Sequence, residues 1–541
     1  MLRLKANYCR FKHCSVKSGG NPSSAIYMGM SRAALPILAA FLSFFVSAFS
    51  QDTCSKGNVP PSFKLDFEND AGNILLQRES RAVAAQVSDK ELRPELQAPF
   101  WPCKGGNSNR TGASPYTGIF DLTEPTWSFE EPERLSKGPH MPTMKVFHGT
   151  PIIDGERNVY IQSTTGWVYS LTSDGQLRWS FETSDANPGN LAFLEGVVYT
   201  ISQDGTAFAI EAASGKALWQ NKVCFAAPDD THSLVAVPGF VILACSAVER
   251  PATVLGLLQT TGSTDVCALR ADDGQLRWTY SLRKTGRGQL GYNEMPAVVD
   301  GSVVFSDYLG GVYRVSLEDG QEQWYVPGDG LWISTAGGVV VGADGRVYVA
   351  MNRGRGQGML RVHDLSDGAV LWNRTFSEEV NAGVAVGPSQ RDGATAVVVA
   401  VGNNVECAPH VGPAAVERHA KIQVIDSQTQ QLLWSFDLPV SSAPCAGVVS
   451  LNDTCCPDVF GNPTIGIDGS VFVNWSGGLS YALRDANGDG RIDMQDPAEF
   501  SSYHHGGGSN GNTAIAPGLV VVPSCWKIFG FTGLSLRAPS V

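Results

Sequence analysis

The sequence predicts an all-β fold, an eight-bladed β-propeller of four-stranded antiparallel blades. Three observations predict it. A phrase that ends in tryptophan recurs six times at intervals of 40 to 62 residues, short alternating strands precede several copies, and the two ends of the repeat region hold complementary fragments of one more blade. The composition agrees, because 59 glycines and a charged fraction of only 17% are typical of a chain rich in strands and turns.

Each copy of the phrase has the pattern of a β-hairpin. Alternating apolar residues lead into an Asp-Gly or Ser-Gly turn, and the tryptophan follows after three more residues, as in WVYSLTSDGQLRW. The glycine provides the positive φ that a tight turn needs, and the flanks alternate as strands do. The last copy, KIQVIDSQTQQLLW, has Gln430 in place of glycine. The six tryptophans are Trp179, Trp219, Trp278, Trp324, Trp372 and Trp434.

Another pair of short strands lies upstream of several hairpins, for example GNLAFLEGVVYTISQDG and PAVVDGSVVFSDYLGG. Two strands added to a hairpin make one propeller blade. On the outermost strand, the flat tryptophan side chain is predicted to fill the gap between neighbouring blades. The segment PTIGIDGSVFVNWSGGLSYALRD has the strands of a further blade without the closing tryptophan.

The ends of the repeat region predict how the ring closes. Residues 127–129 (WSF) repeat residues 179–181 of a final strand, but no three strands precede them. Residues 514–533 offer three strands without a final one. Together, the two fragments are predicted to form an eighth blade with strands from both ends of the repeat region. Seven blades is the alternative count.

The charge balance excludes one class of partner. The formal net charge is −12, and no basic cluster interrupts the repeat region. Nucleic-acid-binding surfaces are basic. We therefore expect no nucleic-acid partner.

The first part of the chain has the pattern of an export signal. Residues 30–50 (MSRAALPILAAFLSFFVSAFS) combine one early arginine, an apolar run and small residues that predict cleavage before Gln51. An uncleaved membrane anchor is the alternative, although the run is short for the roughly 20 residues of a membrane span. Residues 1–29 are either an unusually long basic leader or a segment upstream of the true start.

These patterns divide the chain into three parts. Residues 1–50 are the leader and signal, residues 51–100 form an arm outside the repeats, and residues 101–541 form the propeller. A secreted or endomembrane-lumenal protein is expected, monomeric and without a membrane span after signal cleavage.

Cysteine usage agrees with export. Ten cysteines remain after the leader, an even number that predicts disulfides whose connectivity the sequence leaves open. No Cys-x-x-Cys pair occurs, so zinc ribbons, thioredoxin-like redox sites and c-type haem attachment lack their motif. Four N-glycosylation triplets fit a eukaryotic secretory route. They begin at Asn109, Asn373, Asn452 and Asn474.

Residues 485–496 (DANGDGRIDMQD) have the pattern of an EF-hand-type calcium loop in the place of an outer blade turn. Calcium prefers six to eight hard oxygens, which alternating acidic residues around the turn at Gly490 supply. The final position departs from the pattern, because it holds aspartate instead of the usual glutamate. A solvated acidic turn is the alternative to a structural Ca²⁺ site. The predicted ligands are Asp485, Asn487, Asp489, the main-chain carbonyl of Arg491, Asp493 and Asp496.

The repeated phrase resembles the PQQ-like repeat of quinoprotein-type β-propellers, as in residues 209–219 (AIEAASGKALW). The lead-in at Trp101 and residues 110–116 (RTGASPY) is similar to the start of non-catalytic members of that superfamily, such as the outer-membrane assembly lipoprotein BamB. The calcium loop resembles those of dockerins. The resemblance covers about residues 100–535 and implies a fold, but it implies no particular activity because the repeat is structural.

Catalysis with a bound quinone is the main alternative function. In quinoprotein dehydrogenases PQQ lies on the propeller axis beside a calcium ion and an aspartate base, and some members clamp it with a vicinal disulfide. The adjacent Cys455 and Cys456 invite that comparison. Against it, the family places this clamp in an early blade, the blades here lack large insertions, and the calcium candidate is one continuous loop. Disulfides from this pair to Cys445 or Cys407 are the other interpretation.

Other catalytic motifs have less support. A Gly-x-Ser-x-Gly match surrounds Ser509, but its flanks are glycine, asparagine and histidine where a nucleophile elbow needs a strand and a helix. His504 and His505 lie in the same glycine-rich loop, and the spacing of the other histidines is not that of a metal site. No catalytic residue is predicted, and PQQ is not expected.

The predicted function is therefore binding or scaffolding. A propeller presents its variable loops on two faces, where aromatic and arginine side chains make recognition surfaces. The insertion at residues 403–420 is the predicted functional loop. We expect a protein or carbohydrate ligand on one face, with PQQ-dependent oxidation of an alcohol or sugar as the alternative.

Overall fold

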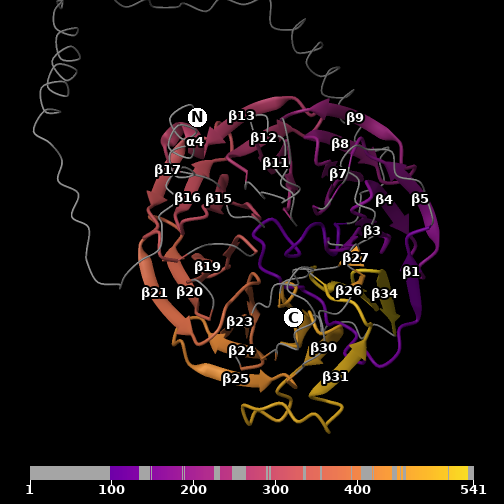
Figure 1. Cartoon of the computed structure of the whole chain (residues 1–541), viewed down its shortest axis with the longest axis vertical. Coiled ribbons are helices and arrows are strands. Elements are labelled where there is room, and N and C mark those ends of the chain that lie inside the picture. The colour runs from indigo at the N-terminus through magenta and orange to yellow at the C-terminus, as the bar shows by residue number, and fades with distance from the viewer. Residues whose placement is uncertain are drawn as a thin grey trace, which may run out of the picture. The chain divides into compact units, whose positions relative to one another are not determined.

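Eight four-stranded antiparallel sheets stand around a common axis in the computed structural model (Figure 1), so the predicted eight-bladed propeller is confirmed. The described residues all belong to one compact unit, Lys90–Val541. No helix among them is long and apolar enough to span a membrane. The structure describes residues 98–533 apart from 133–146, 148, 186, 188, 225–231, 247–262, 288–289, 291–293, 333–336, 354–355, 392, 404–416, 418, 441–447, 451–452, 455–458 and 510.

Blades 1 to 7 each use four strands in chain order. Blade 1 holds β2 (Ile152–Ile153), β3 (Val159–Gln162), β4 (Trp167–Leu171) and β5 (Leu177–Glu182). Blade 2 holds β6 (Ala192–Leu194), β7 (Val197–Ile201), β8 (Thr206–Glu211) and β9 (Ala217–Lys222). Blade 3 holds β10 (Val235–Val237), β11 (Phe240–Cys245), β12 (Asp265–Arg270) and β13 (Leu276–Ser281). Blade 4 holds β14 (Ala297–Val299), β15 (Ser302–Ser306), β16 (Val312–Ser316) and β17 (Glu322–Val326).

The remaining blades follow the same plan. Blade 5 holds β18 (Val339–Val341), β19 (Arg346–Asn352), β20 (Gly358–Asp364) and β21 (Val370–Phe376). Blade 6 holds β22 (Ala385–Pro388), β23 (Thr395–Gly402), β24 (Ala420–Asp426) and β25 (Leu432–Asp437). Blade 7 holds β28 (Thr464–Ile465), β29 (Val471–Trp475), β30 (Leu479–Leu483) and β31 (Phe500–His504). Outside the blades are the pair β26 (Val448–Ser450) and β27 (Asp453–Thr454), and the short helix α4 (Leu282–Thr285).

Blade 8 closes the ring with strands from both ends of the repeat region. Its members are β32 (Ala514–Ala516), β33 (Leu519–Pro523), β34 (Lys527–Thr532) and β1 (Trp127–Glu130). Strand β1 pairs with β34, with Trp127 opposite Gly530 and Glu130 opposite Lys527. The predicted shared blade is therefore confirmed, and it fixes the two ends of the ring to each other by a hydrogen-bonded ladder.

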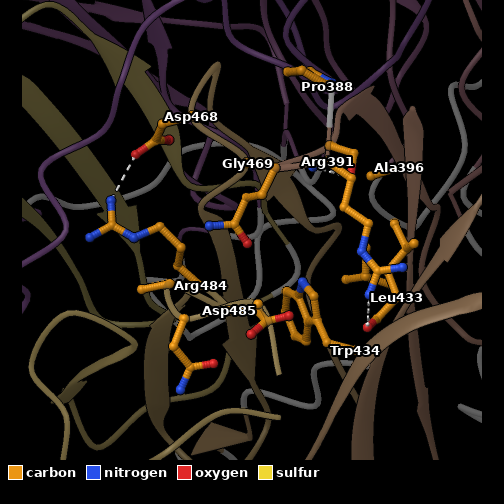
Figure 2. A pocket seen from close by; sticks show the side chains of 15 residues that line it. Pro388, Arg391, Ala396, Leu433, Trp434, Asp468, Gly469, Arg484 and Asp485 are labelled. Carbon is orange, nitrogen blue, oxygen red and sulfur yellow. Dashed lines mark hydrogen bonds and ion pairs between the residues drawn. The ribbon is translucent and has the colours of Figure 1, made fainter. Parts of the chain in front are cut away.

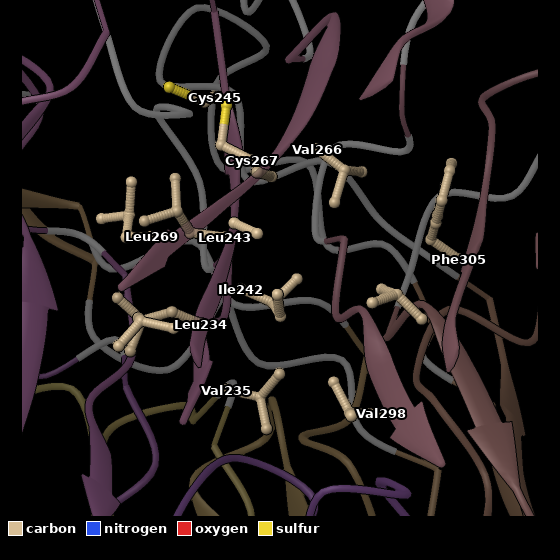
Figure 3. Packing of buried hydrophobic residues seen from close by; sticks show 14 of the residues in the cluster. Leu234, Val235, Ile242, Leu243, Cys245, Val266, Cys267, Leu269, Val298 and Phe305 are labelled. Carbon is tan, nitrogen blue, oxygen red and sulfur yellow. The ribbon is translucent and has the colours of Figure 1, made fainter. Parts of the chain in front are cut away.

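The first strand of each blade faces the axis, and at most junctions it contacts the first strand of the adjoining blade. Apolar residues of facing sheets fill the space between blades. Figure 3 shows this between blades 3 and 4, where Ile242 and Val266 lie opposite Val298 and Phe305 in one buried cluster. The outermost strands are partly exposed, as the alternating burial of β9 shows, which agrees with the alternation in the sequence.

Strand direction divides the connections between two faces. Turns that join strands 1 to 2 and strands 3 to 4 of a blade open on one face, here called the turn face. Connections from strand 2 to 3, and from strand 4 to the next blade, open on the other, here called the loop face. In the described blades the turn-face connections are short, with residues 484–499 of blade 7 as the long exception.

The tryptophans join each blade to the next, as predicted. At five successive junctions the indole packs on the glycine of the next blade's outer turn, and its N–H donates to a main-chain carbonyl there at 2.8–3.0 Å. A β-carbon on those glycines would lie 2.5–2.9 Å from the ring. Glycine is therefore needed twice, for its positive φ and for the close approach. The pairs are Trp127–Gly175, Trp179–Gly215, Trp219–Gly274, Trp278–Gly320 and Trp324–Gly368.

Substituting Gly274 by alanine is expected to lower the free energy of unfolding by about 3 kcal/mol, because the methyl group overpacks the Trp219 ring and the left-handed backbone is strained. Gly274 has φ +68° and its β-carbon would lie 2.5 Å from that ring. The matched control is Gly239→Ala, where φ is +84° and no atom lies within 4 Å. It is expected to lose only about 1 kcal/mol. Urea unfolding followed by tryptophan fluorescence measures both, and equal losses would rule out the packing contact as the cause.

The three remaining junctions depart from this pattern and follow one another. Between blades 5 and 6, Gln430 takes the glycine position at φ +60°, and the buried Trp372 indole nitrogen has no hydrogen-bond partner. Between blades 6 and 7, residues 485–496 replace the turn that Trp434 would meet. Between blades 7 and 8, the last strand has no tryptophan, and Tyr503 packs on Phe529 instead. The structural repeat is therefore least regular around blades 6 and 7.

Candidate functional site

The axis of the ring is occupied by the chain's own residues 100–114, the indigo segment inside the ring in Figure 1. This axial segment hydrogen-bonds to the first strand, or to a residue one or two positions before it, in all eight blades. Its hydrogen-bond partners, in blade order, are Ile153, Phe193, Leu234, Val298, Val341, Val386, Ile465 and Asn512. Trp101 and residues 110–114, which the sequence analysis noted for their resemblance, thus belong to the axial segment.

At two glycines the axial segment packs closely against its surroundings. A β-carbon on Gly106 would lie 2.9 Å from the Trp101 ring. One on Gly112 would lie 2.9 Å from both the Ala385 β-carbon and the Pro463 carbonyl oxygen. Even a methyl group does not fit at these points of the axis.

Arg110 anchors the segment to two blades from a fully buried position. Its guanidinium donates to the main-chain carbonyls of Lys104 at 2.7 Å, of Leu234 in blade 3 at 3.0 Å and of Pro296 in blade 4 at 3.0 Å. The residue has φ +63°, an uncommon conformation for a non-glycine residue. A planar fork with several fixed N–H donors suits arginine and not lysine.

Glu294 lies at the start of blade 4, close enough to Arg110 for the two charges to interact. Its carboxyl is buried and accepts hydrogen bonds from the Ser306 main-chain N–H and hydroxyl, each at 3.2 Å. Burial raises the pKa of Glu294 to about 8, with the charge of Asp307 adding and Arg110 opposing. The carboxyl therefore keeps its proton at neutral pH. Burial together with a strongly raised pKa is found in functional carboxyl groups and in structural ones.

The predicted calcium loop lies between β30 and β31 on the turn face. Asp485 is buried, and the side chains of Asn487 and Asp489 are exposed and accept N–H groups of their own loop. Asp493 and Asp496 do the same one turn later, with N–H donors two residues on. Across the described ranges no three His, Cys, Asp or Glu side chains converge closely enough to hold a metal alone. A bound ion would therefore also need amide and main-chain oxygens.

Asp485 is the most constrained residue of this loop. It is 6% exposed, its Oδ2 accepts the Gly490 N–H at 3.1 Å, and its Oδ1 has no partner. Burial raises the pKa of Asp485, and the nearby charges of Asp489 and Glu499 raise it further. Glu499 is a buried residue that the sequence pattern did not single out, because it lies three positions beyond the twelve-residue motif.

The loop also attaches blade 7 to blade 6. Arg491 forms a parallel bridge with Ser435 of the outer strand β25. Ile492 packs against the buried cluster that these blades share. At this junction the loop therefore takes the place of the tryptophan contact used elsewhere in the ring.

A cleft of about 500 Å³ runs beside the loop between blades 6 and 7. Figure 2 shows Asp485 next to the Trp434 indole, with Arg391 reaching the Leu433 carbonyl and Arg484 paired with Asp468. The Arg484–Asp468 pair measures 3.1 Å. The cleft is thus lined by charges of both signs.

The cysteines only partly follow the prediction of paired residues. Cys224, just after blade 2, forms a disulfide with Cys245 of blade 3, and Cys525 is disulfide-bonded as well. Cys103 and Cys267 are instead buried free thiols, although Cys267 lies near Cys245 in Figure 3. Burial raises the pKa of Cys267 to about 12, which keeps it an unreactive thiol.

Several predicted features fall outside the described residues. They are the signal at 30–50, the arm at 51–97, Cys407, Cys445, Cys455, Cys456, the triplet at Asn452 and most of the insertion at 403–420.

Two motifs of the glycine-rich loop between β31 and β32 have local roles. Ser509 is buried, with no helix in the described residues after it, so the geometry is not that of a nucleophile elbow. His505 contacts the Ser480 hydroxyl at 3.1 Å and packs near Phe529. Burial lowers the pKa of His505 to about 3.

The glycosylation triplets differ in access. Asn474 is completely buried, and its amide donates to the Gly511 carbonyl, so it offers no room for a glycan in this fold. Asn109 belongs to the axial segment and is half-buried. Asn373 is exposed on the outermost strand of blade 5.

Comparison with known proteins agrees with this architecture. The family described as outer membrane protein assembly factor BamB matches residues 123–324, 249–405 and 310–492. The serine/threonine-protein kinase AfsK of Streptomyces griseus is 28% identical over 168 residues, which are 30% of this chain and 18% of the kinase. The chain thus spans less than a fifth of that relative.

Solved structures share the fold at low identity. Quinohemoprotein alcohol dehydrogenase ADHIIG from Pseudomonas putida HK5 is 13% identical with a TM-score of 0.54, and 82% of each chain is covered. The quinohemoprotein alcohol dehydrogenase of Comamonas testosteroni is 13% identical with a TM-score of 0.53 over 82% of each chain. BamB from Moraxella catarrhalis is 14% identical with a TM-score of 0.48, over 75% of this chain and all of that one. Since the family match extends over more than half of the sequence, this chain belongs to the PQQ-like β-propeller family described by outer membrane protein assembly factor BamB.

Proposed function

We propose that the chain is an exported binding propeller, not a quinone-dependent dehydrogenase. The observation that carries the proposal is the axial segment, because it occupies the propeller axis, where quinoprotein dehydrogenases hold PQQ. The partner is a protein or carbohydrate bound on a face of the ring, and the chain works in a secreted or lumenal setting. The disulfide between blades 2 and 3 supports an oxidising compartment.

PQQ does not fit the described part of the axis. A flat, polyanionic quinone needs a slot between inner strands and cationic side chains with free donors. Here the Gly106 and Gly112 positions exclude even a β-carbon. Of the two buried cations of the axial segment, Arg110 already donates to three carbonyls, and Lys104 also has a partner within the fold.

The loop face is the proposed binding surface. Its connections are longer than those of the turn face in several blades, such as residues 183–191, 282–296 and 327–338. Loops held by a rigid scaffold are the usual place of recognition. Aromatic and arginine side chains reach this side, for example Arg287, which lies 3.8 Å over the Tyr325 ring and hydrogen-bonds to Tyr280.

A structural calcium ion in the loop at 485–496 is part of the proposal. The buried, unpartnered Oδ1 of Asp485 supports it, since an uncompensated buried carboxylate oxygen is costly without a cation or a hydrogen bond. The bridge from Arg491 to Ser435 gives the ion a role in joining blades 6 and 7.

The test uses the purified secreted chain incubated with PQQ and Ca²⁺ and then gel-filtered. We expect no retained quinone absorbance and no dye reduction with a panel of alcohols and sugars. Stoichiometric PQQ with turnover would overturn the binding-propeller proposal.

Ca²⁺ is expected to raise the melting temperature over that in EGTA, and the double substitution Asp485→Ala with Asp489→Ala is expected to abolish that rise. An unchanged calcium response in this variant would refute the loop as the site.

A further inference from the structure

Asp496, the twelfth position of the calcium loop, is hydrogen-bonded to the turn that follows the loop. Asp496 Oδ1 accepts the Ala498 main-chain N–H at 2.8 Å, and its carbonyl accepts the N–H groups of Glu499 and Phe500, each at 3.0 Å. The residue therefore caps a turn that leads into β31. Asn487, Asp489 and Asp493 accept N–H groups that lie within residues 485–496, whereas the donor to Asp496 lies beyond them.

Glu499, at the end of that turn, lies inside the loop instead. It has no exposed surface. Its Oε1 accepts the Asn487 N–H at 3.1 Å and its Oε2 accepts the Asp493 N–H at 2.9 Å, so the carboxylate spans both halves of the loop. Each carboxylate oxygen keeps a second lone pair, which is free for a cation.

Asp485 and Glu499 form a buried acidic pair without a cation. Asp485 is 6% exposed with Oδ1 unpartnered, and its Oδ2 and both oxygens of Glu499 accept main-chain N–H groups of the same loop. In the described part of the chain neither carboxylate has an ion pair, because the nearby Arg484 pairs with Asp468. Two buried carboxylates held near each other favour a divalent cation between them.

We propose that Glu499, not Asp496, is the terminal acidic ligand of the calcium ion, acting together with Asp485. This inference rests on the calcium site of the proposed function. The three extra residues are accommodated because residues 496–499 fold into one turn that returns Glu499 beneath the loop. Glutamate also restores the longer carboxylate that EF-hand-type loops use at their end. The ligand class is a hard divalent ion that takes oxygen donors.

The test compares the wild-type chain with E499Q and D496N by calcium titration calorimetry and by terbium luminescence excited through Trp434, whose indole lies beside Asp485. Loss of one charged ligand is expected to weaken Ca²⁺ and Tb³⁺ binding by on the order of 100-fold in E499Q, and by less than about threefold in D496N. Should E499Q not fold, E499D serves instead, with a loss of about tenfold expected because the charge is kept and the reach is shortened.

The outcomes separate the inference from the proposal beneath it. If the wild-type chain binds neither ion, the calcium site itself fails. If it binds but D496N loses affinity as much as the Glu499 variants or more, the assignment of Glu499 is overturned. A merely bracing Glu499 would lower the melting temperature equally in Ca²⁺ and in EGTA, whereas a ligand lowers it mainly in Ca²⁺.

Discussion

Replacing Arg110 by alanine is expected to lower the free energy of unfolding by roughly 5 kcal/mol. The substitution leaves the carbonyls of Lys104, Leu234 and Pro296 without their donor in a site that water does not reach. Each buried acceptor that loses its partner costs about 1–3 kcal/mol. The emptied volume of a large side chain adds to that loss. Arg110→Lys is expected to recover only part of the stability, since one ammonium does not reproduce the planar fork.

Arg157→Ala is the matched control for this substitution. Arg157 is also an arginine at positive φ, +66°, but it is exposed, and the hydrogen bond from its guanidinium to the Pro517 carbonyl is 3.4 Å long. Its loss is expected to be within about 0.5 kcal/mol. Denaturant unfolding with tryptophan fluorescence and circular dichroism compares the two. Similar denaturant midpoints for the two variants would contradict the role of Arg110 in anchoring the axial segment.

The blades could be predicted because their signals are local. A glycine turn, two alternating flanks and a tryptophan lie within about fourteen residues, and each has a physical reason at that position. The shared blade followed from the same pattern, since residues 127–129 repeat a fourth strand that lacks its first three. Even the irregular copy was visible, because Gln430 stands where the structure needs positive φ.

The axial segment could not be predicted, because its contact partners are distant in sequence and do not recur at a regular spacing. Arg110 meets Pro296 at a separation of 186 residues, and Gly105 meets Asn512 at 407. The sequence marked residues 110–116 by resemblance but gave no reason to place them on the axis. For the same reason it left the pairing of Cys224 with Cys245 open and missed that Cys103 and Cys267 are free.

The candidate calcium site was located from sequence but not completed. The alternating acidic residues define a loop, yet which side chains turn inward depends on how residues 496–499 fold back. Glu499 lies outside any twelve-residue window and is visible only through its burial. Glu499 lies in the loop that replaces the tryptophan contact between blades 6 and 7, where the repeat is least regular.

Replacing Glu294 by glutamine is expected to stabilise the propeller in a pH-dependent way, by up to about 4 kcal/mol at pH 8. The folded-state pKa of Glu294 is raised to about 8 from an ordinary value of 4.5. The unfolded chain therefore loses this proton above pH 4.5 while the folded chain keeps it. The free energy of unfolding then falls as pH rises from 4.5 to 8, by at most about 1.4 kcal/mol per unit. Glutamine is neutral throughout, keeps both contacts to Ser306 and removes this dependence.

The difference between E294Q and the wild-type chain is therefore expected to be smallest near pH 4.5 and to grow with pH. Urea unfolding at half-unit steps from pH 4.5 to 8.5 measures it, with E156Q as the control because Glu156 is an exposed carboxylate on a blade 1 turn. Histidines act in the opposite direction, since burial lowers the pKa of His363 and of His505 and the fold weakens below about pH 6.5 for that reason. They are common to all three chains and cancel in the difference. If the free energy of unfolding varied with pH in the same way in E294Q and wild type, Glu294 would be ionised in the folded chain. The Arg110 guanidinium would then be held by the negative charge of Glu294 as well as by the three carbonyls.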